Sequence, residues 1–270
     1  MNARRGIPGW LAGIIGVLVL VGAWWILSAT AFQPAPGTTF TPVPSPVAVV
    51  DWLFLQGNIL GAWGVFQPTI TAAALGFAWG NGLALLLAAT VLLLPWIETV
   101  VTQIAVVSYC LPVVAVGGIA IVLLGGAKRP GDPSSTAIFL AALAVFFTTV
   151  VGALLGFKSA ERATLDVVKV FGGGRWTQLV KVRIIAALPA ILNALQIAVP
   201  TALLGAVLGE YMGATDRSVG ITLIRLQGQL DSAGVWAVFL LCAVIALIGY
   251  AAVGLIARLV TPWVSGRRVA

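Results

Sequence analysis

Few residues of this 270-residue chain could do chemistry, because acidic, basic and amide side chains are rare and lie within or beside long apolar runs. Asn193, Gln196 and Glu210 fall in one such run, which Pro200 interrupts. Asn193, Gln196 and Pro200 are three and four residues apart, which places them on one face of a helix. Such a face either lines a path for a solute or hydrogen-bonds a neighbouring helix. Glu210 is a candidate for a pathway or gate; the alternative is an interfacial carboxylate that reaches water.

The composition excludes most functional classes. Hydrophobic residues make up 60% of the chain and charged residues 9%, whereas soluble domains carry about 25% charged residues. A soluble enzyme or a nucleic-acid binder would need far more polar surface, so we expect an all-α integral membrane protein. The chain has no histidine, which removes the commonest metal ligand and general base. We therefore predict no metal site, no cofactor and no catalytic residue.

Six runs are long and apolar enough to cross a bilayer core of about 30 Å. We predict transmembrane helices at residues 10–32, 69–94, 99–124, 136–157, 184–210 and 232–257. Pro68 is expected to start the second helix, and an extended Pro-rich loop follows the first. The first run could also be a cleavable signal peptide, but it exceeds the usual apolar length of about 7–15 residues.

The positive charges select an orientation. With the N-terminus inside, all but four of the 15 Lys and Arg residues fall on inner segments. The outer ones are Lys128, Arg129, Arg217 and Arg225. Because Lys and Arg are concentrated in cytoplasmic segments, we predict that both termini are cytoplasmic.

One polar segment, residues 158–183, separates the fourth and fifth spans and carries eight charged residues. Apolar side chains recur at helical spacing in its first part, and Arg162, Asp166 and Lys169 share another face. The apolar positions are Ala163, Val167, Val170 and Phe171. Three glycines, 172–174, then interrupt the pattern before a second short amphipathic piece with Trp176, Leu179 and Val180 on one side. The segment thus predicts a cytoplasmic helix–turn–helix.

Two interpretations of this loop remain open. It is either a docking surface laid into a partner's groove or a membrane-surface loop whose charges only satisfy topology. The glycines do not form a phosphate-binding loop, since no strand precedes them and no Gly-Lys-Ser/Thr follows.

The same residues resemble a known motif, the EAA loop of binding-protein-dependent ABC importer permeases (type I importers). The matching stretch is Asp166-Val167-Val168-Lys169-Val170-Phe171-Gly172-Gly173-Gly174-Arg175-Trp176, followed by Ala186-Ala187-Leu188-Pro189. The wider pattern is similar to the nitrate, sulfonate and taurine branch. It comprises Pro44-Ser45-Pro46, Gly76-Phe77-Ala78-Trp79-Gly80 and Glu210-Tyr211-Met212-Gly213-Ala214. The chain departs from the pattern at the acidic position, which is Asp166 rather than Glu, and at Val167 and Val168, which replace two alanines.

The resemblance implies that this loop inserts into a cleft of an ATPase subunit. The docking residues would be Asp166, Val167, Phe171, Gly172, Arg175 and Trp176. Gly172 would take a positive φ in the turn, and Arg175 and Trp176 are residue types enriched at interfaces. Apart from the resemblance, the polar groups and the proline of the fifth span make Asn193, Gln196, Pro200 and Glu210 the candidate pathway or gate residues.

We therefore predict six transmembrane helices with a cytoplasmic coupling loop between spans four and five. The expected domains are an N-terminal part at 1–43, a permease domain at 44–261 and a basic tail at 262–270. The predicted function is that of an inner-membrane permease subunit, itself not an enzyme, in an ATP-driven importer. Expected partners are ABC ATPase subunits, an external substrate-binding protein, a second permease copy and membrane lipid, but no nucleic acid. The alternatives are a secondary transporter driven by an ion gradient and a membrane scaffold.

Overall fold

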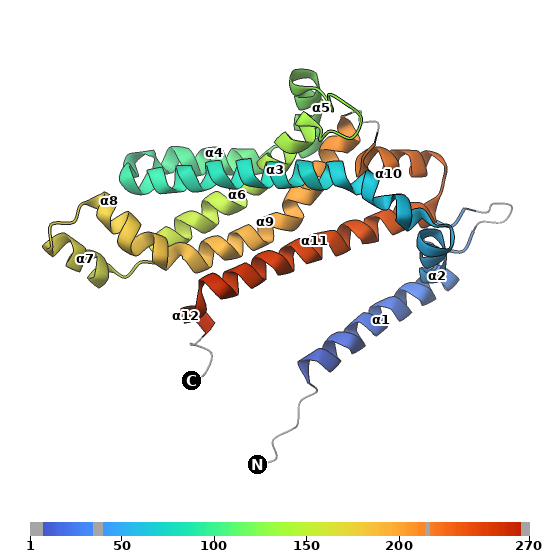
Figure 1. Cartoon of the computed structure of the whole chain (residues 1–270), viewed down its shortest axis with the longest axis horizontal. Coiled ribbons are helices and arrows are strands. Elements are labelled where there is room, and N and C mark those ends of the chain that lie inside the picture. Colours follow the sequence, from blue (N-terminus) through green and yellow to red (C-terminus); the bar gives the residue numbers. More distant parts are fainter. Residues whose placement is uncertain (1–7, 35–39, 214–216, 266–270) are drawn as a thin grey trace, which may run out of the picture. The chain divides into compact units, whose positions relative to one another are not determined.

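The computed structural model describes residues 8–34, 40–213 and 217–265, which form helices and connecting loops without strands (Figure 1). Four of the predicted inner charges lie outside these residues: Arg4, Arg5, Arg267 and Arg268. The same holds for some of the residues assigned to the N-terminal part and to the basic tail. Five helices are long and apolar enough to cross a membrane. They are α1 (Gly9–Thr30), α3 (Asn58–Leu93), α6 (Ser135–Lys158), α9 (Ile184–Met212) and α11 (Ser232–Val260). The chain is therefore a multi-pass, all-helical membrane protein.

The predicted third span is not one straight helix. It divides into α4 (Glu98–Cys110) and α5 (Val113–Leu124), which are bent by 96°. Leu111 adopts an extended conformation with ψ 130°, because the residue before a proline is disfavoured in the α region. Pro112, the N-cap residue of α5, is also extended with ψ 110° and has no N–H to continue α4. Among the described residues, five helices are long and apolar enough to be spans, or six if the bent pair counts as one.

The second span begins earlier than predicted. Pro68 does not start α3 but is buried inside it, ten residues after the helix begins at Asn58. The ring leaves the carbonyl of Gly64 without its usual helical donor, yet the helix continues to Leu93. At about 1.5 Å per residue, its 36 residues extend about 54 Å, well beyond the hydrocarbon core.

Two compact units divide the chain, and the larger comprises residues 64–222 and 242–270. In this unit α6 packs extensively against α9. Small residues allow these two helices to approach closely. A Cβ at Gly152 of α6 would lie only 2.6 Å from the Cβ of Ala194 of α9, so a larger residue than glycine would not fit there. Gly76 and Gly80 of α3 face α6 in the same way. Small residues four positions apart allow helices to approach this closely.

The smaller unit, residues 1–63 and 223–241, is held by tryptophans. Trp24 of α1 and Trp236 of α11 stack with ring centroids 5.4 Å apart. Their indole N–H groups donate to the carbonyls of Pro44 at 3.0 Å and Pro42 at 3.3 Å. Ser45 then caps α2 (Pro46–Val50), which continues as a π-helical turn to Leu55. The Pro-rich segment that precedes α2 is thus fixed by indole donors.

The remaining elements are short. They are a 3₁₀ turn at Pro95–Ile97, α7 (Arg162–Val170), α8 (Arg175–Gln178), a π-helical turn at Leu179–Arg183, α10 (Val219–Gly228) and α12 (Pro262–Ser265). The second part of the polar segment is not a separate helix, because α8, the π turn and α9 form one apolar helix from Arg175 to Met212. Figure 1 shows α7 and α8 at one end of α6 and α9.

Candidate functional site

The polar segment folds as a helix, α7, a glycine turn and the start of the long helix that leads into α9. The N–H of Gly172 donates to the carbonyl of Lys169 and that of Gly173 to the carbonyl of Val168, both at 2.8 Å. These two bonds form a Schellman motif that ends α7. Gly172 has φ +79°, so the predicted positive φ is confirmed. Gly173 has a separate requirement, because a Cβ there would lie 2.4 Å from Cγ1 of Val168.

Apolar side chains on the outside of the loop are largely uncovered by the described part of the chain. Val167 is 55% exposed, Phe171 85% and Trp176 65%, and Val170 is exposed as well. These four residues are here called the apolar loop face. Val167, Val170 and Phe171 lie on α7 and on the turn, outside the long spans, and Trp176 lies in the first turn of the long helix from Arg175 to Met212. An exposed apolar cluster at the end of a span marks a surface that meets a partner protein or the membrane.

The opposite side of the loop is anchored in the protein. Leu165 and Leu179 are buried, and Leu179 belongs to a core cluster with Phe157 of α6. The Gln178 amide donates to the carbonyl of Leu165 at 3.4 Å and thereby ties α8 to α7. The sequence pattern grouped Leu179 with Trp176, but the structure separates them, because only Trp176 faces outward.

Arg175, a predicted docking residue, contacts the chain itself. Its Nη1 donates to the carbonyl of Leu93, at the end of α3, over 3.2 Å. The guanidinium remains exposed and keeps further donors for a partner. Asp166 forms an exposed ion pair with Lys169 at 2.8 Å, so both residues sit on the polar face of α7 as predicted.

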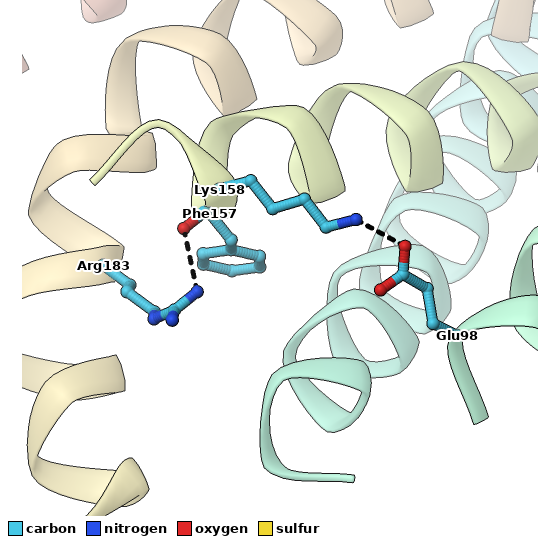
Figure 2. A network of polar contacts seen from close by, with 4 residues as sticks. All are labelled: Glu98, Phe157, Lys158 and Arg183. Atoms are coloured by element: carbon cyan, nitrogen blue, oxygen red, sulfur yellow. Dashed lines mark hydrogen bonds and ion pairs between the residues drawn. The ribbon is translucent and has the colours of Figure 1, made fainter. Parts of the chain in front are cut away.

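The base of the loop is joined to neighbouring helices by polar contacts (Figure 2). Lys158 at the end of α6 forms an ion pair with Glu98 at the start of α4. Nη1 of Arg183 donates to the carbonyl of Phe157 at 3.4 Å. The ends of α6, α4 and the helix that leads into α9 therefore meet at the end of the bundle that carries the apolar loop face.

Glu210 lies far along the same helix and is 1% exposed, which is inconsistent with an interfacial carboxylate that reaches water. Its Oε2 accepts from the Thr69 hydroxyl at 2.9 Å and from the N–H of Gly220 at 3.2 Å. The Thr69 hydroxyl in turn accepts from the N–H of Val219 at 3.2 Å. Oε1 is buried without a hydrogen-bond partner among the described residues. The carboxyl group of Glu210 thus contacts the first turn of α10. This placement is favourable because the N-terminus of a helix carries a partial positive charge.

The four predicted pathway residues do not form one site. Asn193 and Gln196 line an open cavity between α9 and the end of α11, with a volume of about 840 Å³. Pro200 is half-buried in the continuous helix, and Glu210 faces α3 and α10 instead. Sequence reasoning missed Thr69 and Gly220, because their contact with Glu210 depends on tertiary packing between separate helices.

Comparison with known proteins places the chain in one family. Residues 80–266 match the family described as "binding-protein-dependent transport system inner membrane component". A probable ABC transporter permease of Haemophilus influenzae is 30% identical over 88% of this chain and 90% of its own. A formylaminopyrimidine transport permease of Halalkalibacterium halodurans is 26% identical, covering 91% and 93% of the two chains. A putative aliphatic sulfonates transport permease of Bacillus subtilis is 26% identical, covering 94% and 88%.

A solved structure of similar fold is a bacterial alginate ABC transporter in complex with its alginate-pentasaccharide-bound periplasmic protein. Its TM-score is 0.57 and its sequence identity 18%, with 93% of both chains covered. The matched family covers most of the spans and the entire loop. The chain therefore belongs to the binding-protein-dependent transport system inner membrane components, and it is the transmembrane permease subunit of an ATP-driven importer.

Proposed function

We propose that the loop between α6 and α9 is the cytoplasmic coupling element onto which an ABC ATPase subunit docks. The observation that carries this proposal is the apolar loop face, which is exposed although the opposite side of the loop is anchored. Val167, Phe171 and Trp176 would enter the cleft of the ATPase, and Asp166 and Arg175 would lie at the polar rim. Gly172 sets the angle between α7 and α8.

Coupling would run along the helix that begins at Arg175 and ends at Met212. Trp176 and Glu210 lie on this one helix, 34 positions apart and thus about 51 Å at 1.5 Å per residue. A displacement of the loop by the ATPase would therefore move Asn193, Gln196 and the Glu210 contacts together. The ATPase hydrolyses ATP, and this chain converts the resulting motion into alternating access.

The loop, both termini and residues 95–98 would lie on the cytoplasmic side of the inner membrane. The cavity between α9 and α11 supports one part of this arrangement, because Pro189 near the start of α9 and Arg258 near the end of α11 line it together. The end of α11 and the loop would thus lie on the same side of the membrane. The positive-charge bias then assigns that side to the cytoplasm.

The partners follow from the number of loops. Each chain supplies one coupling loop, and two ATPase subunits need two loops, so a second permease copy would complete the membrane part as a homodimer. An external binding protein would deliver the solute to the opposite side. The permease domain would comprise residues 44–261, between an N-terminal part with α1 and a short basic tail.

The test of docking compares two neighbouring glycines. Gly172→Val places a β-branched residue at φ +79°, which costs roughly 1–3 kcal/mol in local strain. Gly174→Val is the control, since Gly174 has φ −77° and a Cβ there meets nothing within 4 Å. With both variants inserted in the membrane at equal level, we expect the ATPase to co-purify with Gly174→Val but to be reduced with Gly172→Val. Equal recovery would contradict the proposal.

A further inference from the structure

The cavity between α9 and the end of α11 has an unusual lining for a membrane-spanning region. Its polar members are Asn193, Gln196, Tyr250, Arg258 and Thr261, and the remaining lining is apolar. Its volume of about 840 Å³ falls within the range of small-molecule sites. Arg258 is the one charged residue of the lining, and no carboxylate accompanies it.

Most of the side-chain hydrogen-bonding capacity of this lining is unused within the described residues. Asn193, Gln196, Tyr250 and Arg258 make no side-chain hydrogen bond or ion pair with the part of the chain that the structure describes. The Thr261 hydroxyl, by contrast, donates to the carbonyl of Ala257 at 2.7 Å. A guanidinium offers five donors in a planar fork, and each amide adds two. The cavity is therefore rich in donors and carries a positive charge.

Gly254 makes room for one of these donors. A Cβ at Gly254 would lie 2.5 Å from Nε2 of Gln196, so the amide occupies the space that a side chain on α11 would fill. Asn193 lies nine positions into α9, which is about 14 Å along the helix axis. Polar groups at such depth are costly if they face acyl chains, and the lining is therefore suited to a polar ligand.

We propose that this cavity binds the oxyanion group of an amphipathic or small organic anion, held by the Arg258 guanidinium and the Asn193 and Gln196 amides. Sulfonate, phosphate and carboxylate oxygens accept from a guanidinium in a bidentate manner. The apolar half of the lining, which includes Leu255 and Ala251, would cover the carbon part of the ligand. Two sources share this chemistry: a transported anion and the headgroup of an anionic lipid.

The transported-anion source rests on the proposed import function, and the lipid source does not. Binding is therefore measured on the permease alone, so that loss of ATPase docking leaves the result unaffected. The full chain is purified in maltoside micelles, which contain neither phosphate nor sulfonate. Ethanesulfonate and dioctanoyl phosphatidylglycerol are titrated separately by calorimetry.

We expect the wild-type chain to bind at least one of the two probes. Arg258→Gln should raise the Kd by about tenfold or more, since hydrogen bonds to charged groups are among the strongest, and Arg258→Lys should recover part of the affinity. Gly254→Ala should also weaken binding without lowering the Tm, because it displaces only the flexible Gln196 amide. Arg225→Gln, an exposed arginine of α10, is the control.

Each outcome is decisive. Binding of ethanesulfonate alone identifies a solute site, binding of the lipid alone identifies a headgroup site, and binding of both identifies a shared oxyanion site. The proposal is wrong if neither probe binds the wild-type chain. It is also wrong if Arg225→Gln weakens binding as much as Arg258→Gln does.

Discussion

The guanidinium of Arg175 donates to the carbonyl of Leu93, so the first turn of α8 is tied to the last residue of α3 across 3.2 Å. This contact satisfies one of the carbonyls that a helix end leaves without a donor. It also gives the coupling loop a fixed relation to a second transmembrane helix. The loop is thus held by α3, by the Leu179 core contact and by the helix that it begins.

The first prediction concerns this contact. Arg175→Ala removes the donor to Leu93, and we expect faster amide hydrogen exchange at residues 162–178, since the loop loses one of its anchors. Arg162→Ala, which removes an exposed arginine without a described partner, is the matched control. Unchanged exchange in Arg175→Ala would show that the contact does not restrain the loop.

The second prediction concerns Glu210. Glu210→Gln keeps an oxygen that accepts from Thr69 and Gly220, whereas Glu210→Ala leaves both donors buried without a partner. Each unpaired buried donor costs about 1–3 kcal/mol, so the Tm in detergent should fall much more for Glu210→Ala than for Glu210→Gln. Similar losses in both variants would instead indicate that the negative charge itself holds α10.

The third prediction uses the close approach of α3 and α6. A Cβ at Gly80 would lie 2.4 Å from the carbonyl oxygen of Ala142. Gly80→Ala should therefore destabilise the protein by roughly 1–3 kcal/mol, as overpacking does. Gly82→Ala meets nothing within 4 Å and should be neutral or slightly stabilising. The two variants are compared by thermal unfolding, and equal Tm values would contradict the helix packing described above.

The fourth prediction concerns topology. A reporter fused after Ala270 should lie in the cytoplasm, and one inserted between residues 37 and 41 should lie outside. The physical reason is the concentration of Lys and Arg on the inner segments. Reporter activity at each position measures the orientation. A reversed pattern would place the apolar loop face outside, where no ATPase could reach it.

Much of the fold could be predicted because it depends on local sequence. Four spans were predicted to within a few residues, since long apolar runs admit few other structures. The glycine turn was predictable because only glycine takes φ +79° without strain. The bend at Pro112 was missed, although the residue before a proline disfavours the α region, because the apolar run continues through it.

The remaining features depend on contacts between distant residues. Thr69 and Glu210 are 141 positions apart, and no periodicity in either helix indicates that they meet. The division of the pathway residues into a cavity and a buried carboxyl site likewise follows from how α11, α3 and α10 pack around α9. The domain boundaries, the orientation of the termini and the second permease copy stay predictions.

A photo-crosslink can show whether the apolar loop face contacts the ATPase. A photoreactive amino acid replaces Trp176 in the full transporter complex, and Arg225 of α10 is replaced in the same way as the control position. On illumination, we expect a covalent adduct with the ATPase subunit from position 176 and none from position 225. An intact complex that gives no adduct from position 176, or equal adducts from both positions, would show that the apolar loop face does not dock the ATPase.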